Sequence, residues 1–224
     1  MSSKRILVIA AHADDEVLGA GGTIARHVAE GDVVHLILMA DGVRSRANAS
    51  EADLARRLNA SECAQTILGI STYHCLGLQD NRMDSVPLLD IVQMLEKVME
   101  EIQPSVIYTH HFGDLNIDHR LTHTAVMTAC RPRPKLFVRE IYGFEVLSST
   151  EWGTPHESPF LPTFFVDISK YLRTKIKALK SYMDEMRDAP HSRSIEHVKS
   201  LARHRGYSIG VDNAEAFAVY RIIR

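Results

Sequence analysis

Residues 6–16 restrict the fold of this chain more than any other segment. Residues 6–10 form an unbroken apolar run, which leads into one imidazole and three carboxylates: His12, Asp14, Asp15 and Glu16. Such a run is typical of a buried strand, and the glycine-containing segment that follows predicts the opening of a helix. The charged cluster is therefore expected at the carboxyl edge of a strand, where open α/β sheets bind their ligands.

The spacing inside this cluster suits a metal ion. His12 and Asp15 stand three residues apart across the strand-to-helix turn, so both side chains can reach one ion. Asp14 or Glu16 then remains free to handle a proton. This combination indicates a metal-activated hydrolase.

Apolar runs alternate with segments of helical period along the chain. Strands are predicted at residues 5–10, 33–40 and 105–109, and helices at residues 17–30, 51–68 and 88–102. The apolar stripe of the second helix consists of Leu54, Leu58, Cys63, Ala64, Ile67 and Leu68, and Gly69 stands where a helix stop is expected. This order predicts βαβ units and a three-layer α/β/α sandwich, which is a Rossmann-like fold with a mostly parallel sheet.

The pattern changes beyond Pro134. A helix is predicted from His119 to Arg131, and later helices at residues 170–188 and 194–205. Strands are predicted at residues 136–146, 163–168 and 216–223. Residues 148–162 form a predicted loop that contains the only tryptophan, Trp152, and a loop of this length is usually functional. We expect it to border the substrate.

Composition narrows the class of protein. The 224 residues are long enough for one substantial core, and we expect a single domain over residues 1–224. A formal charge of −2 gives no general attraction to nucleic acid or to anionic lipid. The sequence has no apolar stretch near the roughly 20 residues that span a bilayer and no signal-peptide pattern at its start. We therefore expect a cytoplasmic protein without nucleic acid or a membrane as a partner.

The three cysteines argue against a thiolate site. Cys63, Cys75 and Cys130 are widely spaced and form no CxxC pair, so neither a disulfide framework nor a thiolate zinc site is encoded. We expect reduced, buried thiols.

A second polar cluster follows the predicted strand at residues 105–109. It includes His110, His111, Asp114, Asp118 and His119. If this strand lies parallel to and near the first, its loop reaches the His12 cluster and supplies a third ligand. We favour His119 as this ligand, with Asp118 nearby as an orienting carboxylate of the site. Two histidines and a carboxylate with an open position for water are an established catalytic zinc set.

Two alternative interpretations concern these same residues. His119 and His123 are four apart on one helix face, the spacing of HExxH zinc helices, but the glutamate of that motif is missing. Asp14 and Asp15 could instead cap the helix and face the positive end of its dipole.

Two further alternatives concern the class of chemistry. Gly19, Gly21 and Gly22 after a first strand resemble a dinucleotide-binding turn, although the GxGxxG spacing is absent. Asp14 could also act as an aspartyl nucleophile in phosphoryl transfer, but the neighbouring histidine would then have no role.

A family resemblance separates these alternatives. The segment Ala-His-Ala-Asp-Asp-Glu at residues 11–16 resembles the AHPDDE hallmark of the zinc-dependent LmbE-like (PIG-L) N-acetylglucosamine deacetylases. Residues 114–120 resemble the second, histidine-ending motif of that family, and the similarity extends to Gly206 and residues 214–217. The resemblance implies Zn²⁺ held by His12, Asp15 and His119, with Asp14 as general base. It also implies a Rossmann-like sandwich, a small N-acetylated sugar as substrate and a homo-oligomer.

Two positions depart from the family pattern. Ala13 replaces the usual proline, which relaxes the backbone preference of His12. Asn116 stands where many members carry a histidine, and an amide cannot deliver a proton at neutral pH. We expect Asn116 to contact the substrate and Asp14 to return the proton to the leaving amine.

Two more residues complete the predicted site. His191 loosely resembles a histidine motif near the family's C-terminus, and we expect it to stabilise the oxyanion. Arg44 follows the second predicted strand and is expected to contact a sugar or phosphate group.

The leading hypothesis is a zinc amidohydrolase that removes acetyl from an N-acetylated sugar or glycoconjugate. A metal-dependent phosphoesterase and a nucleotide-binding module without catalysis are the alternatives.

Overall fold

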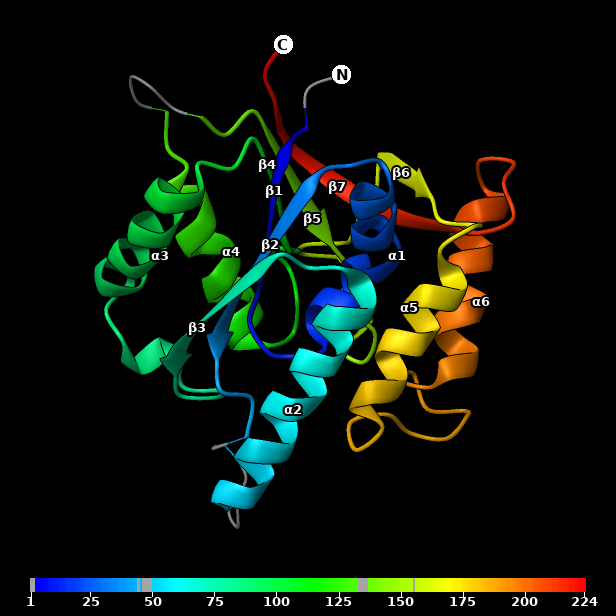
Figure 1. Cartoon of the computed structure of the whole chain (residues 1–224), viewed down its shortest axis with the longest axis horizontal. Coiled ribbons are helices and arrows are strands. Elements are labelled where there is room, and N and C mark those ends of the chain that lie inside the picture. Colours follow the sequence, from blue (N-terminus) through cyan, green and yellow to red (C-terminus); the bar gives the residue numbers. More distant parts are fainter. Residues whose placement is uncertain (1–2, 44, 46–49, 133–136, 155) are drawn as a thin grey trace.

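One mixed sheet forms the centre of the computed structural model, which describes residues 3–43, 45, 50–132, 137–154 and 156–224. The strand order is β3-β2-β1-β4-β5-β7-β6 (Figure 1). The strands are β1 (Arg5–Ala10), β2 (Val33–Ala40), β3 (Thr72–Leu78), β4 (Val106–His110), β5 (Glu140–Phe144), β6 (Phe164–Asp167) and β7 (Ala214–Ile222). The strands β1 to β5 pair in parallel, whereas β7 runs antiparallel to both β5 and β6.

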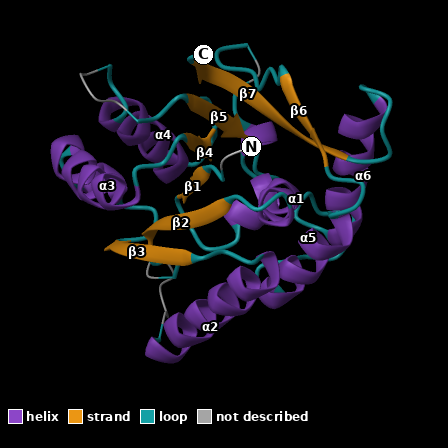
Figure 2. Ribbon diagram, turned by 45° about the horizontal axis from the view of Figure 1, so that its top comes forward, coloured by secondary structure: helices purple, strands orange, loops and turns teal. Residues whose placement is uncertain are grey.

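Helices cover both faces of this sheet. They are α1 (Asp15–Ala29), α2 (Glu51–Leu68), α3 (Leu88–Ile102), α4 (Ile117–Ala129), α5 (Leu172–Leu179) and α6 (Ile195–Tyr207). Figure 2 shows α3 and α4 on one face and α1, α2, α5 and α6 on the other. The predicted three-layer α/β/α sandwich with a mostly parallel sheet is therefore confirmed. Among the described residues, no helix combines the length and the apolar character needed to cross a membrane.

The continuous apolar run of β1 serves two cores. Ile6 and Val8 pack into the core on the α1 side, whereas Leu7 and Ile9 pack into the core on the α3 side. Because side chains of a strand alternate between faces, a strand covered on both sides is apolar at every position.

Most predicted elements agree with the structure within a few residues, and three differ. The edge strand β3 was not predicted, because His74 and Gly77 interrupt its apolar residues and most of its side chains are exposed or half-buried. The predicted helix at residues 170–188 ends at Leu179 and passes into a single 3₁₀ turn, Lys180–Tyr182. This turn brings the Tyr182 hydroxyl to the buried Glu16 carboxylate, at 2.8 Å. The predicted strand at residues 136–146 is only five residues long.

The predicted apolar stripe of α2 is partly wrong. Ala64 and Leu68 are buried, but Cys63 is exposed, and the polar residues Arg57, Ser61 and Gln65 occupy the buried face. Cys75 is exposed as well, so only Cys130 fulfils the expectation of a buried thiol. The helix itself was predicted with its correct bounds, and Gly69 ends it in the left-handed conformation.

The glycines of α1 serve packing. A Cβ atom at Gly19 would collide with the Phe144 ring, and one at Gly22 would lie 2.8 Å from the side chain of Ile168. These glycines let α1 approach its neighbours closely. Close packing therefore accounts for them, and a dinucleotide-binding turn is not needed to explain them.

A buried ion pair ties α1 to the end of the chain. Glu215 of β7 accepts hydrogen bonds from the backbone N–H groups of Gly22 and Thr23. Lys175 of α5 donates to Glu215 at 2.6 Å and to the backbone oxygen of Leu18 at 2.8 Å. The helix that starts at Asp15 is thus fixed by residues about 200 positions further on.

Candidate metal centre

The turn between β1 and α1 has an unusual backbone conformation. Asp14 has φ 114° and ψ −27°, which is a strained conformation for a residue with a side chain. Hydrogen bonds within the turn hold it: the His12 N–H donates to Asp15 Oδ2, and the Asp14 N–H donates to Glu16 Oε2, both at 2.9 Å. The Asp14 side chain makes no capping hydrogen bond to α1, so the capping interpretation fails for that residue.

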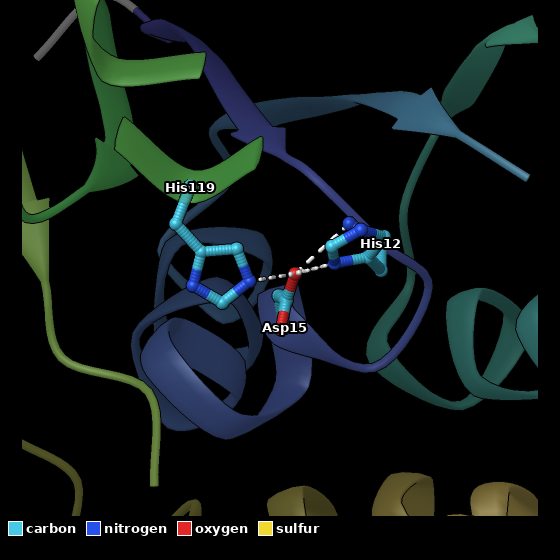
Figure 3. Close-up of side chains that lie close together, drawn as sticks. All are labelled: His12, Asp15 and His119. Atoms are coloured by element: carbon cyan, nitrogen blue, oxygen red, sulfur yellow. Dashed lines mark hydrogen bonds and ion pairs between the residues drawn. The ribbon is translucent and has the colours of Figure 1, made fainter. Parts of the chain in front are cut away.

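The structure brings together the three residues predicted as metal ligands. His12 Nδ1 lies 3.3 Å from Asp15 Oδ2, and His119 Nε2 lies 3.2 Å from the same oxygen. Figure 3 shows the two imidazoles on either side of the Asp15 carboxylate. All three residues are buried, and their candidate ligand atoms lie within 4.8 Å of one another. The strands β1 and β4, whose ends carry these residues, are adjacent and parallel as the prediction required.

The outward nitrogen of each histidine is held by another carboxylate. His12 Nε2 lies 3.0 Å from Asp118 Oδ2, and His119 Nδ1 lies 3.1 Å from Asp114 Oδ1. Asp118, predicted as an orienting carboxylate of this site, therefore faces His12 and not His119. Carboxylates in this position fix the ring and raise the basicity of its metal-facing nitrogen. The donor set and its surroundings thus fit a divalent metal such as zinc.

Both orienting carboxylates are themselves anchored. Asp118 accepts hydrogen bonds from the backbone N–H groups of Asn81 and Met83, at 2.7 and 3.1 Å. Asp114 accepts from the hydroxyls of Ser149 and Thr150, which belong to the predicted loop at residues 148–162. This loop therefore borders the candidate site.

The carboxylates create a negative potential around the imidazoles. Burial alone would lower the pKa of His119, but Asp15 and Asp114 outweigh it and raise that pKa to about 9. Burial also opposes protonation of His12, and its carboxylate neighbours Asp118, Asp15 and Asp80 raise its pKa well above the usual value. A field that favours a proton on these rings also favours a metal cation in its place.

Asp14 points away from the imidazoles and toward two arginines. Its Oδ2 lies 3.2 Å from Arg193 Nη1 and 3.4 Å from Arg57 Nη2. Burial raises the pKa of Asp14, and the two guanidinium groups offset only part of this effect. The sequence predicted a role for neither arginine, and no local pattern marks either of them.

His110 packs against the cluster of His12, Asp15 and His119 at the end of β4. Its ring stacks on His119 with the centroids 4.0 Å apart, and its Nε2 accepts the Ala11 N–H at 2.8 Å. Burial lowers the pKa of His110 well below the usual value, so the ring is neutral. It positions the strand end without acting as a proton donor.

The remaining predicted residues lie at different distances from this centre. Asn116 caps α4 through its Oδ1, donates from Nδ2 to Asn81 and lines the same cavity as the three metal-site residues. His191 is exposed, packs near Trp152 and does not line that cavity. Arg44 lies outside the described residues.

His123 donates to the backbone oxygen of His110 and packs against Tyr220, which favours a structural role over pairing with His119 on a metal.

The metal centre opens into a cavity of about 240 Å³. Its walls combine the cluster with two arginines, acidic side chains and hydroxyls: His12, Asp14, Asp15, Arg57, Asp80, Asn116, His119, Ser148, Ser149, Glu185 and Arg193. A small polar ligand therefore reaches the metal-facing atoms and the Asp14 carboxylate from one space.

Comparison with known proteins identifies the family. Residues 7–130 match the family described as PIG-L, GlcNAc-PI de-N-acetylase. The chain belongs to the PIG-L family. An uncharacterized deacetylase, YaiS, from Escherichia coli (strain K12) is 31% identical over 185 residues, which cover 80% of this chain and 90% of that protein.

Two further similarities extend this picture. A 4-oxalmesaconate hydratase from Pseudomonas putida is 28% identical over 191 residues, which cover 79% of this chain and 72% of that protein. The fold is similar to that of the N,N'-diacetylchitobiose deacetylase from Pyrococcus horikoshii, with a TM-score of 0.79 and 21% identity. That alignment covers 98% of this chain and 85% of the archaeal one.

Proposed function

We propose that this member of the PIG-L family is a zinc-dependent N-deacetylase that acts on an N-acetylglucosamine-type sugar or glycoconjugate. The observation that carries the proposal is the buried cluster of His12, Asp15 and His119, in which a carboxylate holds each outward imidazole nitrogen. The family description, which names a de-N-acetylase of a GlcNAc compound, supports the sugar substrate.

His12, Asp15 and His119 would hold the metal. A zinc ion with two histidine ligands, one carboxylate ligand and an open position supplies Lewis acidity and a water of pKa about 7. Asp118 and Asp114 would keep the two rings in the orientation that points one nitrogen of each at the ion.

Asp14 would serve as the general base. Its carboxylate lines the cavity beside Asp15, contacts neither imidazole within hydrogen-bond distance and is held in place by Arg57 and Arg193. It would accept a proton from the attacking water and then transfer it to the departing amine. Asp14 must perform both transfers because Asn116 carries no titratable proton.

Three residues are proposed for the substrate. Asn116 lines the cavity and carries amide N–H groups suited to a sugar or acyl oxygen. Arg44 remains proposed as a sugar contact. His191 remains proposed for the oxyanion; its exposed position requires the segment around Trp152 to close over the bound substrate.

The cellular setting is proposed from the sequence. The chain would act as one domain over residues 1–224, in the cytoplasm and as a homo-oligomer, on a small molecule and without nucleic acid or a membrane.

A hydratase activity is the second candidate. The observation that favours it is the match to a 4-oxalmesaconate hydratase over 79% of this chain, combined with Asn116 in place of a proton-donating side chain. Addition of water to a carbon–carbon double bond needs a base for the water but has no amine to expel.

One experiment separates these candidates. The purified protein is first analysed for bound metals and then assayed for acetate released from N-acetylhexosamine derivatives. In parallel, phosphate esters are assayed for phosphate, and conjugated dicarboxylates are followed by loss of ultraviolet absorbance. We expect stoichiometric zinc and acetate release that a chelator abolishes. Zinc-loaded protein that releases phosphate or hydrates the double bond, and releases no acetate, would refute the proposal.

A further inference from the structure

A second, larger cavity lies beside the metal centre. It has a volume of about 370 Å³ and lies between α2 and residues 181–185, which follow α5. In Figure 1, α2 and the end of α5 run side by side at the lower edge of the molecule. We call this cavity the α2 groove.

The α2 groove and the metal cavity share a wall. Arg57 and Glu185 line both cavities. The Arg57 guanidinium joins them, because its Nη2 lies 3.4 Å from Asp14 Oδ2 and its Nη1 lies 2.7 Å from Glu185 Oε1. The two cavities are therefore adjacent, with the Arg57–Glu185 ion pair between them.

The chemistry of the groove differs from that of the metal cavity. Its walls include the apolar surfaces of Val43, Ala60, Cys63 and Met183, and the Met183 side chain is 56% exposed. These side chains offer an apolar ligand a surface to cover.

Charged groups at the groove are paired with one another. Arg56 contacts Asp53 and lies 4.0 Å from Asp184, on the opposite side of the groove. Arg57 is paired with Glu185, as described above. No cation among these named groups is left to attract an anionic ligand, and the acidic side chains disfavour one.

The size of the metal cavity also requires more space for a substrate. Ligand cavities in proteins usually measure roughly 300 to 1,000 Å³. The metal cavity, at about 240 Å³, falls short of this range, and only together with the α2 groove does it reach the middle of it.

We propose that the α2 groove binds an uncharged, apolar aglycone attached to the N-acetylated sugar. The substrate would then be an alkyl or aryl glycoside whose sugar lies at the metal centre and whose aglycone lies against Cys63 and Met183. This inference rests on the proposed deacetylase function and deepens it by naming the second half of the substrate.

The first test fills the groove. Cys63→Trp places an indole in it from an exposed position on α2, so the core is not disturbed. Ala55→Trp is the matched control, because Ala55 is exposed on the same helix and lines neither cavity. The measurement is the ratio of kcat/KM for hexyl N-acetylglucosaminide to kcat/KM for free N-acetylglucosamine.

We expect the unaltered protein to prefer the hexyl glycoside by at least about tenfold, the scale of a few methylene groups in an apolar pocket. Cys63→Trp should lose this preference, and Ala55→Trp should keep it. Equal ratios in all three proteins, with acetate still released, would refute the groove and leave the deacetylase proposal intact.

The second test does not depend on turnover. Cys63 and Cys75 are both exposed, so the two thiols can be alkylated with iodoacetamide and followed separately by peptide mass spectrometry. Hexyl N-acetylglucosaminide should slow alkylation of Cys63 at least threefold and leave Cys75 unchanged, and free N-acetylglucosamine should protect neither.

Equal alkylation rates with and without the hexyl glycoside would overturn the groove proposal. If neither glycoside releases acetate, the deacetylase proposal fails, and protection of Cys63 still decides whether the groove binds the apolar group.

Discussion

The two loops that carry the candidate metal ligands differ in how they are held. The first loop, residues 11–16, runs from the end of β1 into the first turn of α1, and the second, residues 111–120, runs from the end of β4 into the first turn of α4. Hydrogen bonds between residues two or three apart close the first loop on itself. The second loop instead depends on Asp114, whose partners Ser149 and Thr150 lie 35 and 36 residues further along the chain.

The two loops also support each other crosswise. Asp118, from the second loop and the start of α4, holds His12 of the first, and Asp15 of the first lies beside His119. The geometry of the first loop thus depends mainly on contacts between residues close in sequence. The geometry of the second loop depends on contacts with residues distant in sequence. The following changes test this difference, from the largest expected effect to the smallest.

Loss of a ligand should have the same effect in both loops. His12→Ala and His119→Ala should each leave less than about a tenth of the zinc bound, because two remaining ligands hold the ion poorly. Elemental analysis after dialysis measures this. His123→Ala is the control and should keep its zinc; if it loses the metal while His12→Ala retains it, the helix-face pair of His119 and His123 is the correct assignment.

Removal of the Asp14 carboxylate should distinguish the roles of the two loops, because we assign the proton transfer to the first loop alone. Asp14→Asn keeps the shape of the side chain, and asparagine tolerates the positive φ at this position. We expect kcat for acetate release to fall by at least about a hundredfold. Zinc content should stay unchanged, although loss of the buried charge beside Arg57 and Arg193 should lower the melting temperature. A near-normal rate would remove Asp14 from its proposed role.

Substitution of the two orienting carboxylates should show that the second loop depends on distant contacts and the first does not. Asp118→Asn and Asp114→Asn should each weaken zinc affinity by about 10- to 100-fold, measured by competition with a chelator. Only Asp114→Asn should also make the loop around Ser149 more sensitive to proteolysis, because that loop is tied to the Asp114 carboxylate. Equal protease sensitivity of both variants would contradict the comparison.

The smallest effect concerns the acid stability of α4, the helix that follows the second loop. Burial lowers the pKa of His123, whose ring supports the end of β4, to about 4. The unfolded chain, with a pKa of 6.5, binds this proton first as the pH falls, so His123 costs stability between pH 6.5 and 4 and not above this range.

His123→Gln removes this titration and keeps a side-chain donor. We expect the stability of the variant relative to the parent to improve by on the order of 2 kcal/mol from pH 7 to pH 4. Urea unfolding at several pH values measures the change. A constant difference across this range would show that the ring does not titrate in this way.

The sequence predicted the parts of the fold that periodicity encodes. The run at residues 6–10 predicted a buried strand, and Gly69 marked the end of the helix α2. The strand β3 was missed because its apolar residues are interrupted by His74 and Gly77 and form no continuous run. Cys63 was misplaced because the buried face of α2 is polar where it meets the candidate site.

The candidate site was predictable in its ligands and not in their support. The motifs at residues 11–16 and 114–120 contain His12, Asp15 and His119, and adjacent parallel strands bring them together. The partner of each histidine could not be read from spacing, since Asp118 is next to His119 in sequence and contacts His12 in space. Arg193 reaches Asp14 across 179 residues, a contact that no local pattern contains.

The tie between Glu215, Lys175 and α1 limits how far this chain can be shortened. Every proposed ligand lies within residues 7–130, the stretch that matches the family. The groups that fix α1 and Asp114 lie beyond it, at Thr150, Lys175 and Glu215 among others. A fragment ending at Cys130 would therefore carry a complete set of donor atoms without the scaffold that aligns them, and the motif-bearing half is not a transplantable module.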